Sequence, residues 1–285
     1  MLEPIAAAIT SATGTPLGSL TSRPVSGGCI SRASVITDGT HTYFLKLNCP
    51  AFVENFIAES AALTGIAKTR TVRVPAPNCH GTTPTSSYLV LEYLSLTGPA
   101  KATLGTTLAA LHQHTSADQR FGWHRDNFIG TTPQPNPWTR SWADFFTTHR
   151  LAHQLDLAAG NGHTFSRVTG LLESVRSKLT NHHPPPSLLH GDLWSGNAAS
   201  STGGTPVVFD PATYYGDRET DLAFTHLFGG FPGAFHTAYH SAYPLPDGHR
   251  SRRRIYNLYH LLNHHNLFAG HYTAAAQQSI DSLLA

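Results

Sequence analysis

The sequence predicts an α+β fold with two lobes, a small β-rich lobe followed by a larger and mainly helical lobe. Strand patterns are concentrated in the first third of the chain, and helical spacing of apolar residues dominates the remainder. The chain has 285 residues, of which 40% are hydrophobic, which is enough to bury a substantial core. We therefore expect an N-lobe over residues 1–94 and a C-lobe over residues 95–285.

The N-lobe elements follow from local patterns. An Asp38-Gly39 pair between two apolar runs is a strong hairpin signal, and the nearly continuous apolar run before Leu94 is typical of a strand buried on both faces. A hinge is expected near residues 92–96, where strand patterns give way to helical spacing of apolar residues. The predicted elements are strands at 34–36, 42–47 and 88–94 and a helix at 51–67.

The C-lobe is predicted to be helical, with two short strands around a polar loop. Three prolines and a glycine between Asn127 and Pro137 predict a loop there. The predicted elements are helices at 102–114, 138–159 and 165–179, strands at 187–189 and 206–209, and helices from residue 222 to the end, broken near Gly229-Gly230 and 244–246.

Composition excludes several classes of protein. Only 13% of residues are charged, the formal net charge is +2, and no run of Lys or Arg would follow a nucleic-acid backbone. No apolar run approaches the ~18 residues of a membrane span, and the first residues carry no signal-peptide pattern. Three widely spaced cysteines are not a disulfide framework. A cytoplasmic enzyme, most simply a monomer, is the expectation.

The strongest chemical signal is His190-Gly191-Asp192-Leu193-Trp194-Ser195-Gly196-Asn197. Phosphoryl transfer from ATP needs a carboxylate that orients the attacking hydroxyl and oxygen ligands for Mg²⁺, and the kinase catalytic loop supplies both with this Asp-to-Asn spacing. Asp210 follows at the end of the next strand, where a kinase keeps its second metal ligand. An Asp and an Asn that merely cap a turn are the simpler alternative, but the ordered set favours a catalytic Asp192 with Asn197 and Asp210 as metal ligands.

Upstream residues complete a predicted ATP site. Lys46 ends an apolar strand, where a kinase places its phosphate-holding lysine, and Glu59 follows on the next helix. A glycine pair before the first hairpin lets backbone amides approach phosphates, although any tight hairpin favours glycine. The segment after the apolar strand is the predicted adenine hinge. The predicted nucleotide-binding residues are Gly27, Gly28, Cys29, Lys46, Glu59, Leu91, Glu92, Tyr93 and Leu94.

The motif at residues 190–197 resembles the fructosamine kinase (ketosamine-3-kinase) family, within the wider aminoglycoside-phosphotransferase-like and protein-kinase-like group. The resemblance implies ATP- and Mg²⁺-dependent phosphorylation of the sugar 3-hydroxyl of a ketoamine, after which the phosphate is lost and the amine is released. It also implies that Asp192 is the base, that Lys46 holds phosphates and that residues 91–94 bind adenine. Matching stretches include SGGCIS, YFLK, FIAESAAL, LVLEYL, FGWHRDNFIGTTPQPNPW, GDRETDLA, LFGGFP and YNLYHLLNHHNLF.

Five residues are predicted to meet the acceptor. Trp194 could stack on a sugar ring, with core packing as the alternative. Asp217 could meet the substrate amine or act structurally, and Asp221 is interpreted as structural. On the last long helix, a polar stripe containing His260, Asn263 and His264 is expected to line the acceptor pocket. The His260/His264 pair also has zinc-binding spacing, but without the glutamate of an HExxH motif or a nearby cysteine.

The sequence leaves other readings open. The partner is predicted to be a small ketoamine or a glycated lysine or protein. A kinase for another amine-bearing molecule such as an aminoglycoside would share the whole ATP machinery. A redox-sensing pseudokinase is a third possibility, because Cys29 occupies the place of a phosphate-loop cysteine that forms intermolecular disulfides in some members of the family. A redox-linked dimer through Cys29 is accordingly a hypothesis, and which sugar is preferred stays open.

Overall fold

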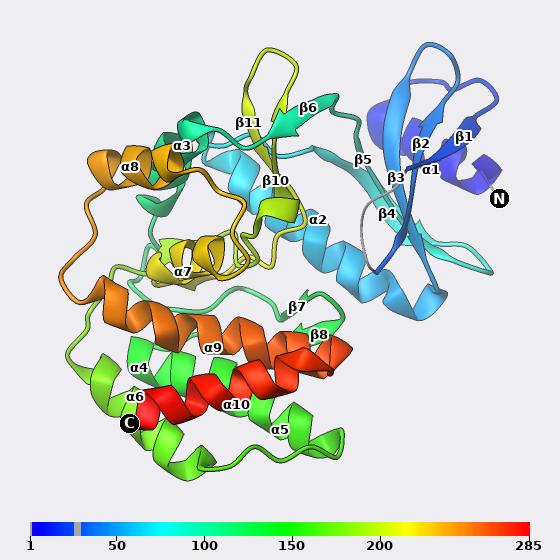
Figure 1. The fold of residues 1–285 in the computed structure, drawn as a ribbon. Helices are drawn as coiled ribbons and strands as arrows, with labels where there is room; N and C mark the ends of the chain where they lie inside the picture. Colours follow the sequence, from blue (N-terminus) through cyan, green and yellow to red (C-terminus); the bar gives the residue numbers. More distant parts are fainter. Residues whose placement is uncertain (1, 26–29) are drawn as a thin grey trace.

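The computed structural model describes residues 2–25 and 30–285. A small β-rich lobe and a larger helical lobe are joined as the sequence predicts (Figure 1). The N-terminal lobe holds an antiparallel five-stranded sheet in the order β1-β2-β3-β5-β4. Its elements are α1 (Leu2–Thr13), β1 (Thr21–Val25), β2 (Arg32–Thr37), β3 (Thr42–Asn48), η1 (Pro50–Phe52), α2 (Val53–Lys68), β4 (Pro77–Thr82) and β5 (Ser87–Glu92).

Strand β5 is buried on both faces, as predicted, because a helix covers each side of the sheet. Alternate side chains of a strand point to opposite faces. Leu89 and Leu91 join the main core that includes α2, whereas Tyr88 and Val90 join a smaller core beneath α1. Helix α1 itself has no counterpart among the sequence predictions.

The predicted β2–β3 hairpin is confirmed, with a four-residue connection. Thr37 pairs with Thr42, and the Asp38 carboxylate accepts hydrogen bonds from the backbone N–H groups of Thr40 and His41 at 2.9 and 2.7 Å. This side-chain capping fixes the register of β3 and therefore the position of Lys46.

The rest of the chain forms the helical lobe. Strand β6 pairs with β10 rather than with the five-stranded sheet, which supports the proposal of a lobe boundary near residue 94. The elements are β6 (Leu96–Pro99), α3 (Ala102–His112), β7 (Asn127–Ile129), β8 (Thr132–Gln134), α4 (Trp142–Phe146), η2 (Thr147–Ala152), α5 (His153–Gly160), α6 (Val168–Thr180), β9 (Ser187–Leu188), η3 (Ser195–Asn197), β10 (Ala198–Ser201), β11 (Pro206–Val208), β12 (Tyr215–Gly216), α7 (Glu219–Leu227), α8 (Gly233–Ala242), α9 (His249–Phe268) and α10 (His271–Leu284).

Two predictions for this lobe need correction. The segment 127–137, predicted as a loop, contains the β7–β8 hairpin, whose polar side chains are satisfied internally: Gln134 donates to Asn127 Oδ1 at 2.7 Å. The helix predicted over 138–159 begins only at Trp142 and is interrupted by the π-helical segment η2. Within the described ranges, no helix has both the length and the apolar character needed to cross a membrane.

Candidate active site

The loop containing Asp192 runs from β9 to β10 and is fastened from beneath by Asp221 of α7. The two carboxylate oxygens of Asp221 accept hydrogen bonds from the backbone N–H groups of His190 and Gly191, at 2.7 and 2.8 Å. Gly191 has φ +85°, and a Cβ there would lie 2.1 Å from the carbonyl oxygen of Ala212. Only glycine therefore fits at position 191. The two hydrogen bonds to the loop backbone support the structural role that the sequence analysis gave to Asp221.

Asn197 holds the Asp192 carboxylate in place. Its Nδ2 donates to Asp192 Oδ2 at 3.0 Å and to the Asp192 carbonyl at 2.9 Å. Burial, followed by the charge of Asp210, raises the pKa of Asp192 to about 7. Because the amide nitrogen of Asn197 is directed at Asp192, its amide oxygen is the atom that could bind a cation.

His190 joins this loop to the strand that carries Asp210. Its Nε2 donates to the carbonyl of Phe209 at 3.0 Å, and its Nδ1 accepts the N–H of Asp192 at 3.2 Å. Burial lowers the pKa of His190, which fits a neutral ring with the proton on Nε2. The imidazole of His190 therefore fixes the distance between the loop that contains Asp192 and the segment that contains Asp210.

Asn197 and Asp210 are brought together by the β10–β11 hairpin. The N–H of Phe209 donates to the carbonyl of Asn197 at 3.1 Å, which places the next residue, Asp210, beside Asn197. Asp210 has φ +57°, an uncommon conformation for a residue with a side chain, of the kind found at functional sites. Asn197 lies just before β10 and Asp210 just after β11. Their amide and carboxylate oxygens are hard donors that suit Mg²⁺.

Lys46 connects the two lobes at this site. Its Nζ lies 2.6 Å from Glu59 Oε1 on α2 and 2.5 Å from Asp210 Oδ1. Burial alone would lower the pKa of Lys46, but the charges of Asp210 and Glu59 outweigh it and raise that pKa above its ordinary value. The lysine therefore stays cationic, as a group that holds phosphates must.

The predicted adenine hinge follows β5, where the chain passes between the lobes. Leu91 is buried in the core, whereas Tyr93 is exposed. The carboxylate of Glu92 pairs with Arg73 and accepts the N–H of Ala76, so this side chain braces the hinge. Adenine contacts at Leu91, Glu92, Tyr93 and Leu94 stay a prediction, and Gly27, Gly28 and Cys29 lie outside the described residues.

Trp194 stands at the open side of the catalytic loop. Trp194 is 38% exposed, unlike most large apolar residues of the protein. Its indole covers Gly196, where an added Cβ would lie 2.2 Å from the ring. A Cβ on Gly230 would lie 2.5 Å from Ser195, so the loop after α7 touches the catalytic loop there. Trp194 is therefore not a core residue, and part of its side chain is exposed to solvent.

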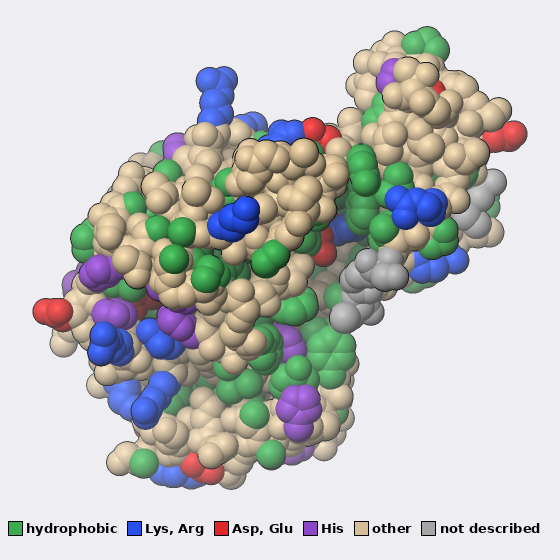
Figure 2. All heavy atoms as spheres, turned by 45° about the horizontal axis from the view of Figure 1, so that its top comes forward, with side chains coloured by type: hydrophobic (Ala, Val, Ile, Leu, Met, Phe, Trp, Pro, Cys, Tyr) green, Lys and Arg blue, Asp and Glu red, His purple; other side chains and the backbone are tan. Residues whose placement is uncertain are grey.

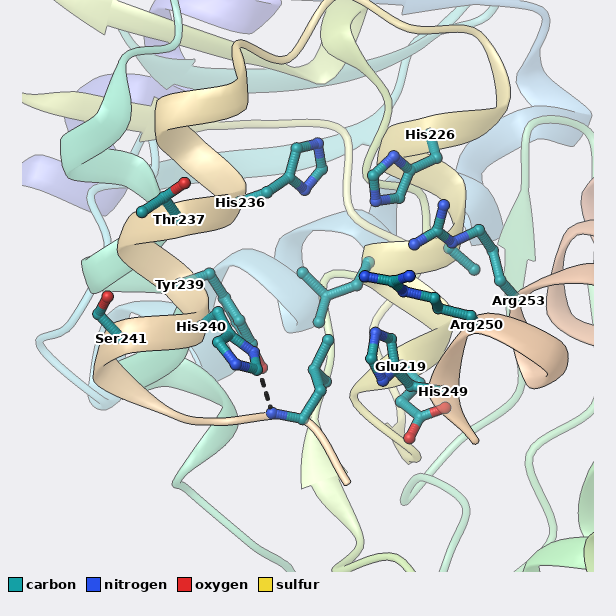
Figure 3. A pocket seen from close by; sticks show the side chains of 13 residues that line it. Glu219, His226, His236, Thr237, Tyr239, His240, Ser241, His249, Arg250 and Arg253 are labelled. Carbon is teal, nitrogen blue, oxygen red and sulfur yellow. Dashed lines mark hydrogen bonds between the residues drawn. The ribbon is translucent and has the colours of Figure 1, made fainter. Parts of the chain in front are cut away.

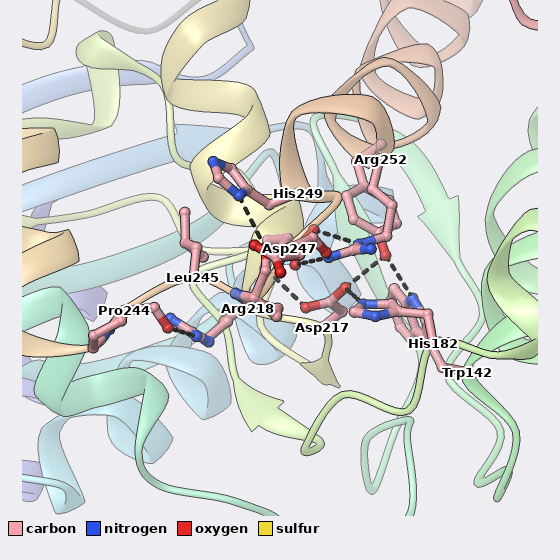
Figure 4. Close-up of polar contacts among 12 residues, drawn as sticks. Trp142, His182, Asp217, Arg218, Pro244, Leu245, Asp247, His249 and Arg252 are labelled. Atoms are coloured by element: carbon pink, nitrogen blue, oxygen red, sulfur yellow. Dashed lines mark hydrogen bonds and ion pairs between the residues drawn. The ribbon is translucent and has the colours of Figure 1, made fainter.

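The predicted contact of Asp217 with a substrate amine is not supported, because its oxygens are occupied inside the protein. Asp217 is 1% exposed, and its Oδ2 accepts hydrogen bonds from His182 Nε2 at 2.7 Å and from the hydroxyl of Tyr256 at 2.6 Å. Figure 4 shows Asp217 and His182 near Arg252. Arg252 forms an ion pair with Glu219. Asp217 is a structural residue.

The polar stripe on α9 also differs from the prediction, since most of it faces the protein interior. His260 is 3% exposed and stacks on Phe224 with ring centroids 3.6 Å apart, and burial lowers its pKa to about 3. Asn263 is 1% exposed and accepts a hydrogen bond from Gln154. Substrate contacts of His260 and Asn263 are therefore not supported, whereas His264 is partly accessible beside Phe228.

A zinc site at His260 and His264 is likewise not found. In the ranges that the structure describes, the single group of three metal-ligating side chains within 4.8 Å is His182, Asp217 and Glu219. All three already belong to the network of Figure 4, in which protein hydrogen bonds satisfy them.

Sequence reasoning missed one residue that supports the site. His112, at the end of α3, is fully buried; its Nε2 lies 3.1 Å from Asp221 Oδ2 and its Nδ1 lies 2.7 Å from the Tyr239 hydroxyl. The only available signal was a histidine in phase with the apolar residues of its helix, a pattern that core histidines commonly show.

Comparison with known proteins identifies consistent relatives. Residues 1–285 match the family model described as fructosamine kinase. A probable ketoamine kinase of Synechocystis sp. is 49% identical, covering 99% of this chain and 96% of the relative, and the chloroplastic protein-ribulosamine 3-kinase of Oryza sativa subsp. japonica is 36% identical, covering 91% and 78%.

Solved structures agree with this. A candidate fructosamine-3-kinase of Haemophilus somnus superposes with a TM-score of 0.92 at 31% identity, covering 99% of this chain and 97% of that one. A thermostable aminoglycoside phosphotransferase mutant, in a complex with ADP and hygromycin B, has a TM-score of 0.62 at 17% identity over 98% and 97% of the chains, and shares the fold.

Proposed function

The chain belongs to the fructosamine kinase family, and we propose that it transfers the γ-phosphoryl group of ATP to the sugar 3-hydroxyl of a ketoamine. The observation that carries this proposal is the meeting of Lys46, Asp192, Asn197 and Asp210 at one place between the lobes. Loss of the 3-phosphate from the product would release the free amine, so the net outcome is deglycation.

The chemical step follows from the positions of these groups. Asp192 orients the sugar hydroxyl and accepts its proton, the oxygen forms a new bond to the γ-phosphorus, and the bond from that phosphorus to the bridging oxygen of ADP breaks. Asn197 keeps the Asp192 carboxylate from rotating away from the acceptor. Positioning of this kind provides much of the rate enhancement in phosphoryl transfer.

Asn197 and Asp210 are the residues that would hold Mg²⁺, and their oxygens suit it. When bound, the cation neutralises charge on the phosphates. Lys46 supplies a second positive charge to the phosphates, and Glu59 keeps its ammonium group pointed at Asp210 rather than at solvent.

On the acceptor side, Trp194 is proposed to stack on the sugar ring of the ketoamine. Phe228 and Phe268, which flank His264, are 40% and 52% exposed and would form the outer rim. A rim that is open to solvent suits an amine carried by free lysine, a peptide or a glycated protein. Because the reaction consumes ATP, we propose a cytoplasmic enzyme.

The aminoglycoside alternative is not favoured. The relatives at 36–49% identity are named ketoamine or ribulosamine kinases, whereas the likeness to the aminoglycoside enzyme is at 17% identity. Likeness at that level reports the shared fold and says nothing about the acceptor.

The test is release of ADP with Mg-ATP and a panel of ribuloselysine, fructoselysine and kanamycin, with Asp192→Ala as the blank. The expected result is turnover on a ketoamine, formation of a sugar 3-phosphate and then of free lysine, all absent in the variant. Turnover on kanamycin alone would overturn the substrate class. Binding of ATP without turnover on any acceptor would favour a pseudokinase.

A further inference from the structure

A cavity of about 380 Å³ lies between helices α7, α8 and α9 (Figure 3). Lys46, Asp192, Asn197 and Asp210 do not line it, so it is separate from the ATP site described above. Side chains from all three helices point into this space. Its basic members, referred to below as the basic pocket, are His226, His236, His240, His249, Arg250 and Arg253.

The guanidinium charges of Arg250 and Arg253 in the basic pocket form no ion pair with the described residues. Glu219 is the one acidic residue of the lining, but it is 4% exposed and is held by Arg252 through two hydrogen bonds of 2.7 and 2.8 Å. Throughout the described part of the chain, no carboxylate lies within 4.0 Å of the guanidinium groups of Arg250 or Arg253.

The basic side chains of the pocket lie close to one another. The rings of His226 and His236 stack with centroids 4.0 Å apart and planes inclined by 8°. Burial, and then the charges of His236, Arg253 and His249, lower the pKa of His226 to about 4. Burial and the charge of Arg250 also lower the pKa of Arg253.

Helix α9 adds to this unfavourable arrangement. Arg250 and Arg253 lie in its first two turns, and its first turn contains no acidic residue. The N-terminal end of a helix carries partial positive charge, so cationic side chains there lower stability and an anion there raises it.

We propose that the basic pocket binds a small organic molecule that carries a phosphate group. Arg250 and Arg253 would contact the phosphate, because guanidinium groups match its oxygens in pairs. Leu222, Ala223 and Leu245 line the same cavity and would contact the organic part. The cavity falls within the ~300–1,000 Å³ range of small-molecule sites and exceeds what a bare phosphate fills.

Phosphate binding is coupled to protonation of the pocket. An anion favours the charged form of imidazoles that face it, so binding is expected to raise the pKa of His226 and of His236 above the lowered pKa that each has in the free protein. The titratable and charged groups that face the site are Glu219 and His226 of α7, His236 and His240 of α8, and His249, Arg250 and Arg253 of α9.

Titration calorimetry with glycerol 3-phosphate and with inorganic phosphate tests the proposal. The full chain is compared with the double variant Arg250→Gln/Arg253→Gln and with Arg254→Gln, a neighbour on α9 that carries the same charge but does not line the cavity. We expect the double variant to bind at least about tenfold more weakly, and Arg254→Gln to match the parent.

Two additional measurements make the outcome decisive. Binding should persist in Lys46→Ala, because the nucleotide site is separate, and the ring-proton NMR signals of His226 and His236 should move on titration. A melting temperature no lower than that of the parent, together with unchanged ketoamine kinase activity, would exclude misfolding of the double variant. No binding up to millimolar concentration, equal weakening in Arg254→Gln, or loss in Lys46→Ala alone would each overturn the proposal.

Discussion

The Nζ atom of Lys46 lies 2.5 Å from Oδ1 of Asp210, although 164 residues separate them along the chain. Lys46 belongs to the N-terminal sheet, and Asp210 follows the last strand of the hairpin that carries Asn197. One ion pair therefore joins the two halves of the proposed ATP site, and its geometry depends on how the lobes meet.

Removing the ammonium group of Lys46 should weaken phosphate binding without unfolding the protein. We expect Lys46→Ala to lower kcat/KM for ATP by about 10²-fold or more, the effect of removing a preorganised charge from a reacting group. The matched control is Lys101→Ala, an exposed lysine at the start of α3. Steady-state kinetics with varied ATP provide the measurement, and similar losses in the two variants would contradict the role of Lys46.

A methyl group at Gly191 should damage catalysis because no space exists for it. The Cβ of Gly191→Ala would meet the backbone of Ala212, and the residue would keep a strained positive φ. We expect a large fall in kcat together with lower stability.

Gly170 provides the matched control for this substitution. It lies in α6 with nothing within 4 Å of an added Cβ, so Gly170→Ala should leave kcat unchanged and raise the free energy of unfolding by about 0.5–1 kcal/mol. Equal kinetics of the two variants would show that the catalytic loop tolerates movement.

Substitution of His260 separates packing from substrate binding. The pKa of His260 is about 3 in the folded protein and 6.5 in its unfolded reference, so the unfolded chain binds the proton more readily. The contribution of neutral His260 to stability is therefore complete above pH 6.5 and decreases as the pH falls towards 3.

Between pH 7.5 and pH 5 the free energy of unfolding of the parent should fall by up to about 2 kcal/mol more than that of His260→Phe, because the phenyl ring takes up no proton on unfolding. Urea unfolding at the two pH values measures this difference. The KM of His260→Phe for the ketoamine should equal that of the parent, because the ring at this position packs on Phe224. A raised KM with normal stability would restore His260 to the acceptor site.

Replacement of Trp194 tests the proposed sugar platform. We expect Trp194→Ala to raise KM for the ketoamine about three- to tenfold, the effect of losing one aromatic contact of ~0.5–1.5 kcal/mol, with KM for ATP unchanged. Trp194→Phe should restore part of the loss. An increase confined to KM for ATP would place the indole on the nucleotide side.

The parts that were predicted correctly are those with local signals. The Asp192-to-Asn197 spacing and the Asp38-Gly39 turn each specify geometry within a few residues, and the structure reproduces both. Strand β10 and the β7–β8 hairpin were missed because each strand is only three or four residues long, and because β8 and β10 consist of polar residues, small residues or proline. Pairing, rather than propensity, makes these segments strands: β7 pairs with β8, and β10 pairs with β11 and with the distant β6.

The acceptor side was predicted less well for a different reason. Helical spacing shows that Tyr256, His260 and Asn263 share a face, but it does not show what covers that face. Helix α7 packs against α9 and supplies Phe224, which stacks on His260. Gln154 of α5 donates a hydrogen bond to Asn263. Asp217 was ambiguous for the same reason, because its partners His182 and Tyr256 come from other segments.

The anchoring of the catalytic loop by Asp221 has a consequence for biosynthesis. A ribosome that has extruded the chain only as far as Asn197 has released every residue of the Asp192 loop, but not the carboxylate that fixes the backbone of His190 and Gly191. The loop can therefore reach its working shape only after α7 has emerged and packed. Nascent chains that end before this helix should therefore be unable to transfer phosphate.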